Sequence, residues 1–273
     1  MKTVFVVAAA GLAGAAIAGP VNVTDNTSGG AVVDGVIGAN EYSITIAGNG
    51  ASGFGGPVGG ATLHLDADDN GIYFGLSNLG DISGNSIRVY FGSDAFAGGF
   101  TELSSAAGFN EQADFGRAQI SRPAGDGVIL PFAADFGWLI SPAFGGFQAL
   151  FDLETGGDNS LIFAGNGVNA TPVGENPSNA VFEAFIPFAD LGILRGDDLQ
   201  LTVLYANNNS GAPEGAFLSN EGFPGQGFAD NPGGNSGGSP LTLPNFIEFN
   251  TIPTPGAAAM LGLAGLAATR RRR

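Results

Sequence analysis

Apolar and polar residues alternate with a period of two along most of the chain. Residues 61–78, ATLHLDADDNGIYFGLSN, carry apolar side chains at every second position on both sides of a turn made of Asp, Asn and Gly. Successive side chains of a strand point to opposite faces, so this pattern predicts a β-hairpin with one buried face. The residues expected on that face are Leu63, Leu65, Ile72, Phe74 and Leu76.

Four further stretches alternate in the same way: SIRVYFG at 86–92, DFGWLIS at 135–141, FQALFDL at 147–153 and LQLTVLYAN at 199–207. Short strands separated by Gly, Pro and Asn clusters predict an all-β protein, a single antiparallel β-sandwich of jelly-roll-like form with long Gly-rich loops. The expected core-facing residues are Ile87, Val89, Phe91, Phe136, Trp138, Ile140, Phe147, Ala149, Phe151, Leu153, Leu199, Leu201, Val203 and Tyr205.

Three other segments predict a turn, a loop and a strand. Residues 187–193, PFADLGI, predict one helical turn, which Pro187 opens and Gly192 closes. Residues 221–240 contain seven Gly and three Pro and predict a long surface loop. Residues 243–250, LPNFIEFN, predict a last strand.

The N-terminus has the pattern of a secretory signal peptide. It carries one early positive charge at Lys2, an apolar run over residues 4–17, and small residues at Ala16 and Ala18. This combination predicts export and cleavage between Ala18 and Gly19. The mature chain is then expected to begin at Gly19.

The C-terminus, residues 252–273, has three parts in a fixed order. They are the motif Pro253-Thr254-Pro255, a 13-residue apolar run at 256–268, and the arginines Arg270, Arg271, Arg272 and Arg273. A helix of that length covers about 20 Å, whereas a bilayer core is about 30 Å thick. The run therefore predicts a short, transient hold in the inner membrane. Its arginines are expected to stay on the cytoplasmic side.

An export signal followed by such a tail resembles the PEP-CTERM family of bacterial surface proteins. The name motif of that family has a glutamate between the two prolines, where this chain has Thr254. The resemblance implies processing by an exosortase-type membrane protease, with delivery to the cell surface or the extracellular matrix. The alternative is a simple tail anchor.

Between the two end segments lies the body, residues 19–251, which is strongly acidic. It holds all 25 acidic residues and four arginines, so its formal charge is −21. The phosphate backbone would repel such a surface, so nucleic acid is excluded as a partner. The chain has no cysteine, and its stability must come from a packed core without disulfides.

Three stretches of the body resemble the DOMON-like and family 9 carbohydrate-binding β-sandwich modules. The first is VVDGVIGANEYS at 32–43, with an Asp-Gly pair and an acidic-aromatic pair. The others are LHLDADDNGIYFGL at 63–76 and VFEAFIPFADLGILRGDDLQLTVLYANN at 181–208. The resemblance implies a sandwich fold and, as an alternative function, a glycan- or exopolysaccharide-binding module, with or without the help of calcium. The paired residues of the first stretch are Asp34, Gly35, Glu41 and Tyr42.

Residue types argue against catalysis. The chain has one histidine, His64, no cysteine, and one lysine, Lys2, so neither a Ser-His-Asp triad nor a histidine-rich metal site can be assembled. His64 alternates with Leu63 and Leu65, which places it off the core face, beside Asp66. The sequence therefore predicts a protein that is not an enzyme and needs no cofactor.

One turn has a weak resemblance to a calcium loop. Asp66, Asp68 and Asn70 have the odd-position spacing of calcium ligands, but Ser77 stands at the twelfth position, where a glutamate is required. A hairpin turn that uses Asp, Asn and Gly explains the same residues and is preferred, which leaves no metal site predicted and one weak calcium candidate.

A ligand surface, if present, is expected on the strand faces opposite the apolar residues. Tyr73, Arg88 and Tyr90 fall there, whereas Trp138 is in phase with the core. The alternative is that this face is a second inner face, covered by loops. The sequence as a whole predicts an exported, non-catalytic surface or matrix protein, and a screen for glycan binding separates this function from the glycan-binding alternative.

Overall fold

The computed structural model describes residues 19–24, 31–48, 60–80, 85–93, 95, 100–103, 128–141, 147–152, 162–165, 181–207, 218–225 and 241–251. The predicted signal peptide up to Ala18 and the predicted tail at 252–273 lie outside these residues. Within the described part of the chain the regular elements are strands, so the all-β prediction is confirmed. None of the described residues belongs to a helix that could cross a membrane.

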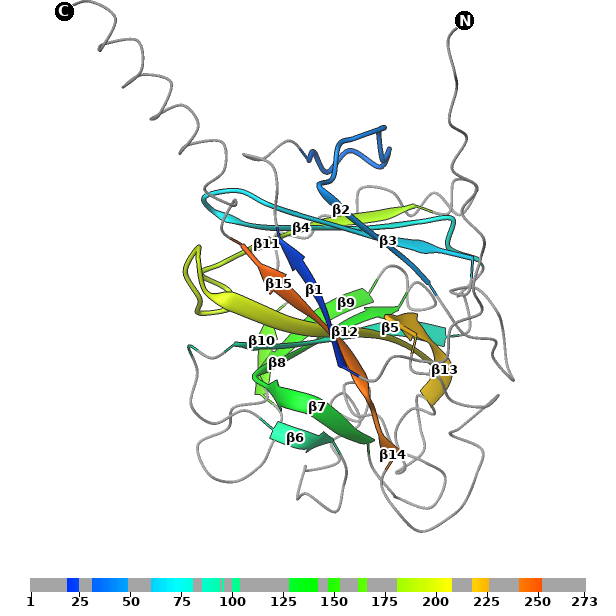
Figure 1. Cartoon of the computed structure of the whole chain (residues 1–273), viewed down its shortest axis with the longest axis vertical. Helices are drawn as coiled ribbons and strands as arrows, with labels where there is room; N and C mark the ends of the chain where they lie inside the picture. The colour runs from blue at the N-terminus through cyan, green and yellow to red at the C-terminus, as the bar shows by residue number, and fades with distance from the viewer. Residues whose placement is uncertain are drawn as a thin grey trace, which may run out of the picture.

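The strands form three open sheets (Figure 1). The eight-stranded sheet has the order β1 (Gly19–Thr24), β15 (Asn245–Asn250), β12 (Asp198–Asn207), β5 (Asn85–Ser93), β8 (Phe136–Ser141), β9 (Phe147–Asp152) and β10 (Ile162–Gly165), and β13 (Leu218–Phe223) also pairs with β12. The four-stranded sheet has the order β11 (Phe182–Pro187), β4 (Gly71–Ser77), β3 (Thr62–Ala67) and β2 (Ile44–Ala47). The three-stranded sheet has the order β14 (Leu241–Thr242), β7 (Val128–Ala134) and β6 (Phe100–Leu103).

The core lies between the four-stranded and eight-stranded sheets, which Figure 1 shows as two layers. Trp138 on β8 is 1% exposed, and its ring centroid lies 5.2 Å from that of Phe74 on β4 and 5.7 Å from that of Phe182 on β11. Burying each such side chain contributes about 1.5–3 kcal/mol. This face-to-face packing is the arrangement expected of a β-sandwich.

The predicted faces of most strands are confirmed. The core contains every apolar residue predicted for the hairpin, and the predicted sets of β5 and β12, while Phe136 of β8 is partly buried against it. The predicted turn after β11 is present as well, because Gly192 N donates to Ala189 O and Ile193 N donates to Phe188 O. Gly192 closes the turn with a φ of 63°, a conformation that glycine adopts without strain.

The predicted face of β9 is wrong. Its register pairs Leu150 with Trp138, and directly opposite residues share a face of the sheet. Leu150, which the prediction placed off the core, is 1% exposed and belongs to the core, and Leu153 lies outside the described residues. In FQALFDL the residues of one parity, Phe147, Ala149, Phe151 and Leu153, are all apolar, so a period of two favours that face, whereas the pairing with β8 selects Leu150 for the core.

Two other predictions need correction. The sandwich is mixed rather than purely antiparallel, because β1 pairs with β15, and β14 with β7, in parallel. The loop predicted at 221–240 begins later than expected, since residues 221–223 belong to β13; residues 226–240 lie outside the described residues.

A third layer covers part of the outer face of the eight-stranded sheet. Asp135 N donates to Phe91 O over 2.8 Å, which ties the end of β7 to β5. A Cβ atom built on Gly92 would lie 2.2 Å from Ala133 O, so the backbone of β7 lies directly on β5. On the side of β5 that faces away from the core, Ser86, Arg88 and Tyr90 are buried as well.

Candidate functional site

Of the three residues predicted for a ligand face, two are buried and one is half-exposed. Arg88 is 2% exposed and Tyr90 is 1% exposed, so both are removed from an accessible ligand surface. They lie on the second inner face, which is the alternative that the sequence left open. Burial raises the pKa of Tyr90 to about 12, although Arg88, which donates a hydrogen bond to it, acts in the opposite direction.

Tyr73, the third residue of that face, is half-buried. Its ring packs against Phe185 on β11 at a centroid distance of 4.8 Å, and its hydroxyl donates to Asp68 Oδ2 over 3.2 Å. Burial, and next the charge of Asp68, raise the pKa of this hydroxyl above its usual value. Tyr73 therefore supports the turn between β3 and β4.

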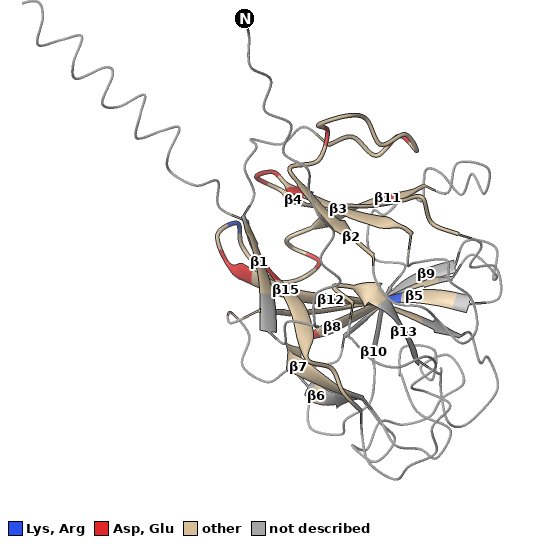
Figure 2. Cartoon of the chain, turned by 45° about the vertical axis from the view of Figure 1, so that its right-hand side comes forward, with Lys and Arg blue, Asp and Glu red and all other residues tan. Residues whose placement is uncertain are grey.

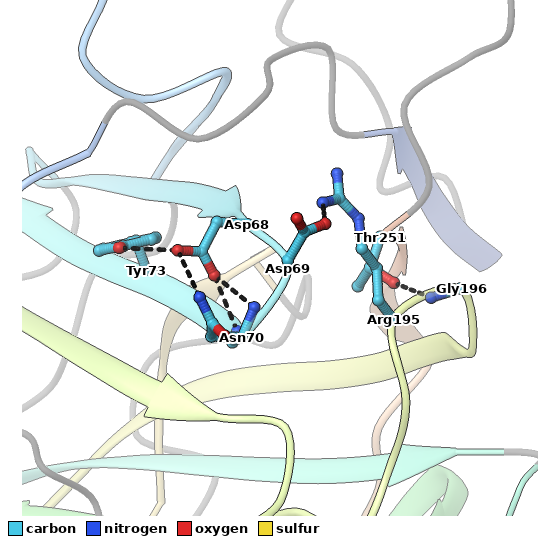
Figure 3. A network of polar contacts seen from close by, with 8 residues as sticks. Asp68, Asp69, Asn70, Tyr73, Arg195, Gly196 and Thr251 are labelled. Carbon is cyan, nitrogen blue, oxygen red and sulfur yellow. Dashed lines mark hydrogen bonds and ion pairs between the residues drawn. The ribbon is translucent and has the colours of Figure 1, made fainter.

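The weak calcium candidate is built as a hairpin turn (Figure 3). Asp68 Oδ1 accepts hydrogen bonds from Asn70 N at 2.7 Å and Gly71 N at 3.0 Å, as in an Asx-turn. Asp66 is fully buried on β3, where Ala31 N donates to it. The predicted hairpin is present, because β3 and β4 pair across this turn. Among the described residues no three His, Cys, Asp or Glu side chains are grouped so that they could hold a metal ion.

The same turn belongs to one end of the sandwich, here called the tail-exit end, which comprises residues 68–71, 187–198 and 250–251. Figure 3 shows Asp69 directed toward Arg195, with which it forms an ion pair. Thr251 lies beside this loop: its hydroxyl accepts from Gly196 N at 2.8 Å and donates to Asp197 O at 3.3 Å. Thr251 is fully buried and is the last described residue before the predicted tail.

Negative charge dominates the tail-exit end. Figure 2 shows red segments where the β3–β4 turn and the loop before β12 meet. The ion pair between Asp69 and Arg195 adds little stability, because the side chain of Asp69 is 86% exposed and exposed pairs contribute about 0–1 kcal/mol. Besides Arg195, the ionisable residues of this end are Asp68, Asp69, Asp190, Asp197 and Asp198.

A second polar cluster lies on the outer face of the four-stranded sheet, under residues 31–43. Glu183 on β11 is fully buried; its Oε1 accepts from the Tyr42 hydroxyl and its Oε2 from Gly35 N, both at 2.7 Å. Gly35 has a φ of 86°, which turns the chain over the sheet. The two carboxylate oxygens thus hold this covering segment at two points.

His64 lies in the same cluster, off the core as predicted but covered rather than exposed. Its Nε2 is 2.7 Å from Ser77 Oγ, and its ring is 5.5 Å from that of Tyr42. Burial lowers the pKa of His64, and burial together with Glu183 raises the pKa of Tyr42, so both groups stay neutral near pH 7. Hydroxyl, imidazole and phenol serve here as packing and hydrogen-bonding groups.

The sequence analysis missed these partners because they are distant in the chain. The Tyr42–Glu183 bond joins residues 141 positions apart. The contact between His64 and Ser77 follows from the hairpin register, in which Thr62 pairs with Ser77 and His64 with Gly75. Counting register across the predicted turn would have brought those two side chains together.

Comparisons with known proteins give a distant likeness among solved structures. No protein-family model and no curated protein matches the chain. A solved structure described as a carbohydrate binding module family 9 (CBM9) from Caldicellulosiruptor kristjanssonii in complex with cellotriose is similar, with 11% identity and a TM-score of 0.37. The match covers 87% of this chain and 97% of that chain. Similarity of this size carries no argument about ligands, and the architecture rests on the strands and their packing.

Proposed function

We propose that this chain is an exported, non-catalytic surface or matrix protein whose C-terminal tail is a sorting signal of the PEP-CTERM type. Its partner is an exosortase-type membrane protease. The tail holds the protein in the inner membrane by a transient insertion of residues 256–268 until it is processed. The protein then resides at the cell surface or in the extracellular matrix.

The observation that carries this proposal is the order of parts in residues 252–273, with a signal-like N-terminus at the other end of the chain. A helix too short to span a bilayer comfortably suits a hold that is later released. Two prolines separated by one residue keep the preceding backbone extended and open to a protease. Each part of the tail thus has a separate task that a variant can remove.

The body supports the same proposal in two ways. A surface with a large net negative charge stays soluble outside the cell and resists association. The polar groups best placed for chemistry, His64, Ser77, Tyr42 and Glu183, hold one another and the segment at 31–43. A non-catalytic role fits this use of them.

Two sets of tail variants test the proposal in the cells that produce the protein. Replacing the arginines at 270–273 with serine removes the stop, and the protein is expected in the medium. Replacing Pro253 and Pro255 with alanine removes the recognition element, and the protein is expected to stay in the inner membrane. Arg122→Ser, which removes an arginine from the body at a position distant in sequence from the tail, is the matched control and leaves sorting unchanged. If both tail variants reach the parent's location, the tail is not a sorting signal.

The glycan-binding alternative rests on the sequence resemblance. Burial of Arg88 and Tyr90 leaves Tyr73 as the half-exposed member of the predicted ligand face. A glycan screen on protein recovered from the cell surface decides between the two functions. Saturable binding of an exopolysaccharide that Tyr73→Ala weakens would favour the alternative, and the absence of binding would favour the non-catalytic structural role.

A further inference from the structure

The place where the chain leaves the sandwich is held firmly. Thr251 follows β15 directly, is fully buried, and is hydrogen-bonded to Gly196 and Asp197 of the loop before β12. That loop is itself closed, because Leu194 N donates to Asp197 Oδ2 at 2.8 Å and Asp197 N donates to Leu194 O at 3.1 Å. The start of the tail and the tip of this loop are therefore fixed neighbours.

The reach of the chain after Thr251 is short. Gly256, where the apolar run begins, is five residues further on, and an extended chain covers at most about 18 Å over that distance. By comparison, the ten residues of β12 span about 33 Å. If residues 256–268 are held in a bilayer, the tail-exit end is the part of the sandwich that lies next to it.

The loop at this end presents an apolar side chain to solvent. Leu194 is 75% exposed, the largest value among the exposed large hydrophobic residues of the described chain, which also include Val21, Val32 and Val36. A leucine exposed to this extent, at the end of the sandwich that lies next to the membrane, can transfer into the headgroup region, where apolar surface leaves water. The adjacent Arg195 can keep its charged head near the phosphates.

We propose that the tail-exit end is a lipid-facing surface, on which Leu194 enters the headgroup layer of a zwitterionic bilayer while the tail holds the protein there. This inference rests on the proposed function, because the tail supplies the hold. The exposed Asp69, Asp190 and Asp198 lie at the same end and oppose approach to anionic lipids. The contact between the tail-exit end and the bilayer is therefore tightest on zwitterionic headgroups. Added salt reduces the difference between zwitterionic and anionic lipids, because it screens the repulsion.

Absence of cysteine from the chain permits a direct test by single-cysteine labelling. The full chain with its tail is placed in phosphatidylcholine vesicles, with an environment-sensitive fluorophore attached to one introduced cysteine. Leu194→Cys and Asp190→Cys report on the tail-exit end. Thr242→Cys, exposed on β14 and away from that end, is the matched control. Ala258→Cys reports separately whether the tail is inserted.

The expected result is a blue-shifted emission that a headgroup-level lipid quencher suppresses at position 194, a smaller effect at 190, and none at 242. In a Leu194→Ser background, the blue shift and the quenching of the label at 190 are expected to decrease. This result distinguishes insertion of the leucine from a loop that only lies close to the bilayer. Anionic lipid in the vesicles is expected to reduce quenching at 194.

Three outcomes contradict the inference. If the label at 258 is quenched by lipid but those at 194 and 242 behave alike, the tail is inserted and the tail-exit end does not face the membrane. If quenching at 194 rises with anionic lipid, the charge argument is wrong. If the label at 258 stays in water, the membrane hold itself fails, and the proposed function fails with it.

Discussion

At the scale of single residues, buried carboxylates determine how the outer face of the four-stranded sheet is covered. Glu183 is fully buried and accepts two hydrogen bonds, from Tyr42 and Gly35. A buried charge is tolerated when such donors surround it. The same donors become a cost once the carboxylate is removed, because they are then buried without a partner.

Glu183→Ala is therefore expected to lower the free energy of unfolding by about 2–4 kcal/mol. Glu248→Ala, at a half-buried position on β15, is the control, with an expected loss of about 0.5 kcal/mol. Urea denaturation followed by circular dichroism measures both. Equal losses in the two variants would show that the bonds of Glu183 do not hold the segment at 31–43.

Tyr42 gives the fold a dependence on alkaline pH. Burial first, and the hydrogen bond to Glu183 second, raise its pKa above 10.0, its value when unperturbed. The unfolded chain therefore ionises before the folded one, so the stability is complete below about pH 10 and falls as the pH rises further. Tyr90, with a pKa raised to about 12, adds a loss of the same sign.

Tyr42→Phe is expected to flatten this alkaline loss in part, while it lowers stability at neutral pH by about 1 kcal/mol for the lost hydrogen bond. Urea midpoints compared at about pH 8 and about pH 11 measure the slope. A variant that loses as much stability as the parent over this interval would show that Tyr42 ionises freely in the folded protein.

At the scale of elements, the start of β4 depends on a glycine. A Cβ atom built on Gly71 would lie 2.3 Å from Ile186 O and 2.7 Å from Phe185 Cζ, so the backbone of β11 leaves no room for a side chain. Gly60, before β3, has nothing within 4 Å of such an atom. These two glycines make a matched pair for a test of strand packing.

Gly71→Ala is expected to cost about 1–3 kcal/mol, because either β11 or the turn must shift. Gly60→Ala is expected to be neutral, or stabilising by about 0.4–1 kcal/mol through the unfolded state. Thermal unfolding of both variants measures the difference. If the two behave alike, β4 and β11 are not packed as closely as the structure has them.

Alternation predicted the buried face of most strands, but not that of β9. The hairpin of β3 and β4 has apolar residues on one parity and a local turn of Asp, Asn and Gly, so both its register and its face follow from neighbouring residues. In β9 most apolar residues have the parity of Ala149, and it is the pairing with β8 that selects Leu150 for the core. The parallel partner of β1, which is β15, lies more than 220 residues away, beyond any local signal.

The same reasoning applies to the candidate site. Asp68 was predicted correctly as a turn residue, because its hydrogen bonds reach only two and three positions along the chain. For Arg88 and Tyr90 the sequence left open an accessible ligand face or a covered inner face; both side chains are buried, and β7, distant in sequence, lies on β5 at Gly92. Alternation reveals that two faces differ, and whether the second one is also covered depends on the rest of the fold.

At the scale of the whole molecule, the packing of the two large sheets centres on the only tryptophan, Trp138. Phe74→Ala, which removes its neighbour from the facing sheet, is expected to cost about 3–5 kcal/mol and to make the tryptophan more accessible to acrylamide. Phe185→Ala, on the outer side of the same sheet, is the control and should leave quenching unchanged. Equal quenching in all three proteins would show that the sheets do not meet at Trp138.

Export and sorting concern the whole chain, and the intact mass of the protein recovered from the surface of its own cells tests them together. The proposal predicts a mature chain that begins at Gly19, the first residue of β1, and that protease added to intact cells can digest. A chain that retains Met1, or that protease reaches only after the cells are opened, would contradict it.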